Sequence, residues 1–140
     1  IVGKWMVRQV ESIVSARAQK AKIYDVGFSN IPEIRKPPRQ LNTKNVFLLY
    51  MVFAQDRDGL LNYCLKKGIE AKIHYPIPIC EQPAWRNHSL PSAFIPVVQK
   101  QKEEILSLPI YAELTDLEVE YIADQVSSFF QQNQNLREAI

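Results

Sequence analysis

Glycine is scarce in this sequence, and its glycines stand apart from one another. Only four of the 140 residues are glycine, and a loop that cradles phosphate through backbone N–H groups needs several close together. Cysteine is scarcer still, since Cys64 and Cys80 are too few for a disulfide framework and lack metal-motif spacing. With two histidines the ligands also fall short of a zinc site. The sequence therefore argues against a phosphate loop, a disulfide scaffold and a structural metal.

Long apolar runs and an excess of one charge are missing as well. The longest apolar run, Val46–Ala54, is strand-sized, whereas a membrane-spanning helix needs about 20 apolar residues. No secretory signal is visible. With 17 Lys and Arg against 15 Asp and Glu, the net charge of +2 predicts no strong attraction to nucleic acid or to anionic membranes. We expect Cys64 to be buried and reduced, which favours a cytoplasmic location.

What the sequence does have is a long helical pattern at its start. Apolar residues recur at helical spacing from residue 2 to about 28, namely Val2, Met6, Val10, Ile13, Val14, Ala21 and Tyr24. At about 1.5 Å per residue such a helix is long for a small domain, so we expect it to act as a connector. The pattern already runs at Ile1, without a methionine or a capping residue. This favours a piece of a longer protein, although a cleaved precursor or an engineered chain would look the same.

Short strands and further helices follow the first helix. The expected strands are Val46–Phe53, Ile69–Ile73 and Ile105–Leu108, of which the last could also end a helix. The expected helices begin after Asp56, which caps a helix ending near Gly68, at about Pro96, and at a capping box of Thr115 and Glu118. Proline-rich residues 31–44 and 74–92 are expected to be loops. The order predicts an α+β fold, in which helices cover a small sheet of at most three strands.

The segment from His74 to Trp85 is the most unusual part of the sequence. It reads His-Tyr-Pro-Ile-Pro-Ile-Cys-Glu-Gln-Pro-Ala-Trp and follows an expected strand, where binding loops are often placed. Its prolines limit its conformations, and its imidazole, phenol and indole groups suit a polar, partly aromatic ligand. The alternative is a structural loop packed on the domain. His88 is expected to be an exposed loop histidine, and His74 with Cys80 lacks the third residue of a catalytic triad.

One basic cluster, Arg35-Lys36-Pro-Pro-Arg39, could contact a phosphate group. A solvated loop explains it better, because charge runs are common on exposed loops. We therefore expect no catalytic, cofactor-binding or metal-binding residue within this sequence.

Taken in order, several short motifs resemble the C-terminal part of the DegT/DnrJ/StrS-type nucleotide-sugar aminotransferases. The resemblance extends from about residue 4 to 130. It is carried by Arg17 and Tyr24 in the long helix, Val46-Phe-x-x-Tyr50, Asp56-Arg-Asp58, Lys67-Gly-Ile69, His74-Tyr-Pro-x-Pro78, Gln82-Pro-Ala84, Leu106-Ser-Leu-Pro-Ile110 and Leu114-Thr-Asp116.

This resemblance implies a fold-type I aminotransferase that uses pyridoxal phosphate and forms a homodimer. Its implied division is a connecting helix (residues 1–30) and a C-terminal small domain with a mostly antiparallel sheet (31–130). The polar composition of residues 131–140 predicts a flexible tail after it. Such enzymes move an amino group from glutamate to a keto-sugar nucleotide, usually for polysaccharide biosynthesis. The family's Schiff-base lysine precedes this segment, so the chain alone is expected to be inactive and to bind no cofactor.

By the same resemblance, His74, Tyr75, Cys80 and Trp85 would line the nucleotide-sugar pocket. Several positions depart from the family pattern, which often has histidine at Cys80 and Leu48, tyrosine at Trp85 and glutamate at Gln99. Two alternatives therefore stay open. One is a sugar dehydratase of the same fold, in which histidine replaces the cofactor lysine, and the other is a non-catalytic nucleotide-sugar-binding or scaffold homologue.

Overall fold

The structure is a computed structural model of the chain that describes residues 2–87 and 95–138. Its helices are α1 (Val2–Gly27), α2 (Arg57–Lys66), α3 (Pro83–Asn87), α4 (Pro96–Glu104) and α5 (Asp116–Glu138), with a 3-10 helix η1 (Ile79–Glu81). Its strands are β1 (Ile34–Arg35), β2 (Tyr50–Ala54) and β3 (Ile105–Leu108). Both pairings are antiparallel in the order β1-β2-β3, with Ile34 opposite Ala54 and Tyr50 opposite Leu108. The expected α+β fold with a small antiparallel sheet is confirmed.

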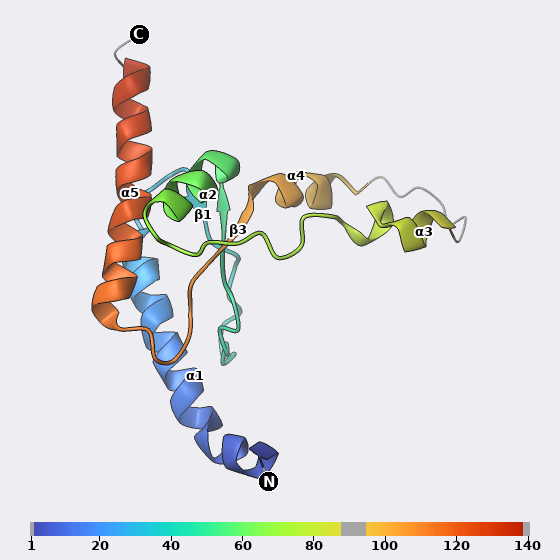
Figure 1. The fold of residues 1–140 in the computed structure, drawn as a ribbon, viewed down its shortest axis with the longest axis vertical. Coiled ribbons are helices and arrows are strands. Elements are labelled where there is room, and N and C mark those ends of the chain that lie inside the picture. The colour runs from blue at the N-terminus through green and yellow to red at the C-terminus, as the bar shows by residue number, and fades with distance from the viewer. Residues whose placement is uncertain (1, 88–94, 139–140) are drawn as a thin grey trace.

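The core forms where the two long helices and the sheet meet. In Figure 1, α5 packs beside the C-terminal half of α1, while the N-terminal half of α1 extends away from the sheet. Tyr24 of α1 is fully buried and its hydroxyl donates to the Pro109 carbonyl at 2.8 Å. The buried face of α5 comprises Val119, Ile122, Ala123, Val126, Phe129 and Phe130.

The expected helix caps are confirmed by specific contacts. The Gly59 backbone N–H donates to the Asp56 carboxylate at 3.1 Å, and Gly68 has a φ of +76° after α2. At the start of α5 the Glu118 N–H donates to Thr115 Oγ1, and the Thr115 N–H donates to the Glu118 carboxylate at 2.8 Å. These signals are local, so the sequence was sufficient to locate them.

The strands differ from the sequence prediction in three places. The strand expected at 46–53 begins only at Tyr50, because Phe47 has a φ of +46° that turns the chain before it. Residues 69–73 form only an isolated bridge, between Lys72 and Ser107. In the proline-rich segment expected to be a loop, Ile34–Arg35 pairs with β2, and its position before Pro37 leaves those backbone groups free to pair.

Residues 131–138 of the expected flexible tail are helical, since α5 continues to Glu138. The sequence from 116 to 138 contains no proline or glycine, and Gln, Leu, Arg and Glu are good helix formers. A polar surface therefore does not end this helix. His88 lies outside the described residues, and no helix in the described part is long and apolar enough to cross a membrane.

Candidate functional site

The segment of His74 to Trp85 lies on an arm, by which we mean residues 74–87. In Figure 1 the arm leads away from the sheet through η1 to α3, at the side of the molecule opposite α5. The sequence predicted no regular element here, which was wrong for η1 and α3. Pro83 occupies the first position of α3, where a missing N–H costs no hydrogen bond.

All four candidate substrate-binding residues lie on this arm. His74 and Tyr75 are exposed, with 72% of Tyr75 accessible, and their ring centroids are 6.4 Å apart. Cys80 and Trp85 are half-buried farther along the arm. The side chains are thus presented on a protruding segment, with the aromatic pair open to solvent. An open aromatic and imidazole pair can stack on and hydrogen-bond a polar ligand.

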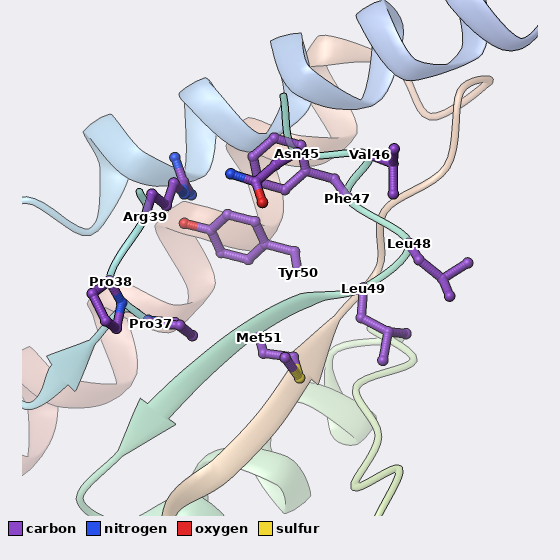
Figure 2. A pocket seen from close by; sticks show the side chains of 10 residues that line it. All are labelled: Pro37, Pro38, Arg39, Asn45, Val46, Phe47, Leu48, Leu49, Tyr50 and Met51. Carbon is purple, nitrogen blue, oxygen red and sulfur yellow. The ribbon is translucent and has the colours of Figure 1, made fainter. Parts of the chain in front are cut away.

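A second feature, which the sequence did not predict, is a cavity of about 340 Å³ beside the start of β2. Figure 2 shows its lining side chains, which come from the proline-rich segment and from the turn into β2. The lining consists of Pro37, Pro38, Arg39, Asn45, Val46, Phe47, Leu48, Leu49, Tyr50 and Met51. None of the four arm residues belongs to it. The cavity is mainly apolar, and Leu48 at its edge is 70% exposed.

Asp25 of α1 forms hydrogen bonds with two residues that line this cavity. Its carboxylate accepts hydrogen bonds from both terminal nitrogens of Arg39, one of them at 2.8 Å, and from the Tyr50 hydroxyl at 2.8 Å. The Lys36 ammonium donates to the Asp25 backbone carbonyl at 3.0 Å. The Arg39 guanidinium also lies 4.9 Å from the centre of the Phe47 ring, a cation–π contact. The proline-rich segment is therefore tied to α1 by charge-assisted bonds.

These contacts raise the pKa of two partners of Asp25, namely Tyr50 and Arg39. Burial raises the pKa of Tyr50, and the hydrogen bond to Asp25 and its negative charge raise it further, so the hydroxyl stays neutral and donates. The hydrogen bond to Asp25 raises the pKa of Arg39. Arg35 pairs separately with Glu104 at 2.5 Å. The side chains of the basic cluster thus form ion pairs within the chain, which supports a structural role over a phosphate contact.

Sequence reasoning missed Asp25, because its partners lie 14 and 25 residues farther along the chain. Within a helical pattern a single aspartate looks like solvated surface. Only the tertiary fold brings Arg39 and Tyr50 to it, so no local spacing could have identified the cluster.

Lys20 is the one buried lysine among the described residues, and its ammonium pairs with Asp116. The glycines do not form a phosphate cradle, since they stand at positions 3, 27, 59 and 68. Nor does the described part contain a group of three or more His, Cys, Asp or Glu residues that could hold a metal ion.

Comparison with known proteins identifies relatives along most of the chain. A sequence model of the DegT/DnrJ/EryC1/StrS aminotransferase family matches residues 2–127. The dTDP-3-amino-3,4,6-trideoxy-alpha-D-glucose transaminase of Streptomyces venezuelae is 31% identical over 94 residues, which cover 67% of this chain and 25% of that protein. The erythromycin biosynthesis sensory transduction protein EryC1 of Saccharopolyspora erythraea is 28% identical over 109 residues, 78% of this chain and 30% of that protein.

Solved structures agree with this assignment of the fold. The S. venezuelae protein DesV has a TM-score of 0.85 at 26% identity, over 91% of this chain and 34% of that one. The aminotransferase TlmJ of Streptoalloteichus hindustanus has a TM-score of 0.85 at 23% identity, over 95% of this chain and 36% of that one. The chain therefore spans about a quarter to a third of the length of these relatives.

Proposed function

Because this chain belongs to the DegT/DnrJ/EryC1/StrS aminotransferase family, we propose that it is the C-terminal part of a nucleotide-sugar aminotransferase. The full-length protein would transfer an amino group from glutamate to a keto-sugar nucleotide. The observation that carries this proposal is the family match over residues 2–127 together with relatives named as sugar transaminases. The chain covers at most about a third of the relatives' length, so the activity belongs to a longer protein.

The arm is the proposed contribution of this chain to the substrate pocket. His74 and Tyr75 are exposed and adjacent, and together they offer ring nitrogens, a phenol and two aromatic faces. These groups can hydrogen-bond sugar hydroxyls and stack on a ring. Cys80 and Trp85 extend the same surface, and Trp85 supplies a further aromatic face for stacking. Residues on a protruding segment are suited to close over a ligand held elsewhere.

Pyridoxal phosphate would be held by a part of the full-length protein other than this chain. The pairing of Lys20 with Asp116 and the wide separation of the glycines support this division. The cofactor would supply the electron sink for amino transfer, and this chain would supply orientation of the sugar. The isolated chain should therefore neither transaminate nor bind the cofactor.

Cofactor binding tests the aminotransferase assignment. The full-length gene product, purified and mixed with pyridoxal phosphate, is expected to acquire the near-visible absorbance band of a lysine-bound cofactor. The 140-residue chain is the matched control and should leave the spectrum of free cofactor unchanged. A full-length protein that leaves the spectrum unchanged would rule out the aminotransferase and favour the dehydratase or non-catalytic alternative.

Ligand titration tests the role of the arm separately. Calorimetry with dTDP-glucose and UDP-glucose on the full-length protein should give saturable binding to one of them. His74→Ala should weaken it about tenfold, the effect of one lost hydrogen bond in a closed pocket. Tyr111→Phe is the control, because Tyr111 is also exposed but lies off the arm. Equal effects of the two substitutions would remove the arm from the binding site.

The partner proposed for this protein is a second copy of itself. The N-terminal half of α1 and the turn before β2 expose apolar side chains, among them Trp5, Val7 and Leu48. Apolar surface of this extent commonly becomes covered in an assembly. Light scattering of the full-length protein should give the mass of a dimer.

A further inference from the structure

One carboxylate of the arm contacts helix α4. Glu81 lies in η1, next to Cys80 and four residues before Trp85. Its Oε1 atom accepts a hydrogen bond from the Gln99 side-chain amide at 2.6 Å and one from the Lys102 ammonium at 2.8 Å. Its Oε2 atom accepts a second hydrogen bond from Lys102 at 3.0 Å. Both oxygens of Glu81 are therefore engaged by α4.

Helix α4 is itself fixed to the sheet and α2, so it can act as a reference for the arm. The Arg57 guanidinium is almost buried and donates to the carbonyls of Lys102 and Ile105, at 3.1 and 3.3 Å. Glu104 pairs with Arg35 of β1. These bonds hold the C-terminal end of α4, and β3 continues from it directly into the sheet. The position of Lys102 is thus set by the core of the domain.

Apolar packing covers the arm at Pro78, which is buried, but not at the residues on either side of it. Ile77 and Ile79 are more than half exposed, and η1 contains no buried residue. Backbone bonds within the arm are short-range, from the Glu81 N–H to the Pro78 carbonyl and from the Trp85 N–H to the Gln82 carbonyl. Such bonds shape the arm but do not orient it. Prolines 76, 78 and 83 make it stiff, so the contact of Glu81 with α4 can direct the segment around it.

We propose that Glu81 is a positioning residue, whose bonds to Gln99 and Lys102 set the orientation in which the arm presents Cys80 and Trp85. The attachment is a charge-assisted pair that lies partly away from water, with Lys102 at 24% and Glu81 at 31% side-chain exposure. Its consequence for ligand affinity rests on the proposed function, whereas the orientation itself does not. Loss of the pair frees a stiff segment to rotate about its base near the Lys72–Ser107 bridge.

Hydrogen–deuterium exchange of the ligand-free full-length protein tests the orientation. In Glu81→Ala and Lys102→Met, peptides covering residues 79–87 should exchange about threefold to tenfold faster, as for loss of a partly buried ion pair. Peptides of α5 should be unchanged. The exchanged pair Glu81→Lys with Lys102→Glu should restore slow exchange, which a loss of side-chain volume alone would not explain.

The matched control is Glu70→Gln. Glu70 also pairs with a lysine, Lys72, at 2.7 Å, but within one segment and outside the arm. Its substitution should leave the exchange of residues 79–87 at the wild-type rate. Unchanged exchange in Glu81→Ala, or failure of the charge exchange to restore protection, would overturn the proposal.

Nucleotide-sugar titration separates this inference from the proposed function. If the arm binds the sugar, Glu81→Ala should raise the dissociation constant about threefold to tenfold, in parallel with exchange, and the charge-exchanged protein should recover affinity. If exchange responds as expected while wild-type protein binds no nucleotide sugar, Glu81 still positions the arm and only the proposed function fails.

Discussion

Hydroxyl groups that donate from buried positions tie the long first helix to the rest of the chain. Tyr24 donates to the Pro109 carbonyl, and Tyr50 donates to Asp25, which also accepts from Arg39. Burial raises the pKa of Tyr24 and of Tyr50, so each hydroxyl keeps its proton in the folded chain. Each tyrosine is therefore neutral in the folded chain, so the free energy of unfolding should depend on pH in the alkaline range.

The chain should lose stability above about pH 10, the ordinary pKa of an unfolded tyrosine. A raised pKa in the fold means that the unfolded chain releases the proton first, so the free energy of unfolding falls as pH rises beyond that value. Tyr50→Phe should lower stability at pH 7 by about 1 kcal/mol and make the alkaline fall shallower. Urea unfolding from pH 7 to 11 measures both. Tyr75→Phe, at an exposed site on the arm, should keep the wild-type slope.

The two cysteines should differ in reactivity. Burial raises the pKa of the Cys64 thiol to about 11, so at pH 8 little of it is thiolate. Cys80 is partly exposed on the arm. Iodoacetamide at pH 8 should therefore label Cys80 and leave Cys64 unmodified until urea unfolds the chain, as mass spectrometry of the two peptides can establish. Equal labelling of both in the native chain would contradict the buried position of Cys64.

At the scale of elements, three helix caps and the strand Ile105–Leu108 could be predicted, whereas the start of β2 and the end of α5 could not. Asp56, Gly68 and Thr115 act within three or four residues, so a local pattern was enough. The start of β2 depends on the backbone of Phe47, which packs against the core and under Arg39. Only the folded chain places those neighbours, and the same holds for the Asp25 cluster.

Four arm residues were located as a segment by sequence alone, yet their exposure was not predictable. The density of proline identified His74 to Trp85 as an unusual loop. Its outward direction depends on Glu81 contacting Gln99 and Lys102, 18 and 21 residues away. Sequence reasoning did not link these residues, because a partner at such a separation has no periodic signal.

Helices α1 and α5 approach each other so closely at Gly27 that a side chain would not fit there. A Cβ atom added at Gly27 would lie 2.8 Å from the Ala123 Cβ atom, closer than real methyl groups approach. Gly27→Ala should therefore destabilise the chain by about 1–2 kcal/mol, despite the better helix propensity of alanine. Gly3→Ala is the matched control, since nothing lies within 4 Å of the added atom. Thermal unfolding should show a lower midpoint for the first variant alone.

At the scale of the whole molecule, the first half of α1 has no core of its own. Trp5, Met6, Val7 and Val10 are all more than 40% exposed, and Figure 1 shows this part of α1 leading away from the sheet. A long amphipathic helix gains most of its stability from packing. This half of the helix should therefore gain stability by packing against another molecule.

Self-association of the 140-residue chain should follow from this exposure. Sedimentation velocity should show oligomers that grow with concentration, because apolar side chains on one molecule cover those on another. Val7→Lys combined with Val10→Lys should shift the chain toward monomer. Val97→Lys, at an equally exposed valine on α4, should not. A strictly monomeric wild type at high concentration would contradict the prediction.

The pairing of the first helix with the last has a consequence for how the protein is made. Lys20 contacts Asp116, 96 residues later, and Tyr24 contacts Pro109, 85 residues later. A ribosome releases the chain from its N-terminal end, at about 5–20 residues per second. The apolar face of α1 must therefore wait several seconds, until α5 has been synthesised and has left the exit tunnel. During that interval the face of α1 that packs on α5 lacks this partner.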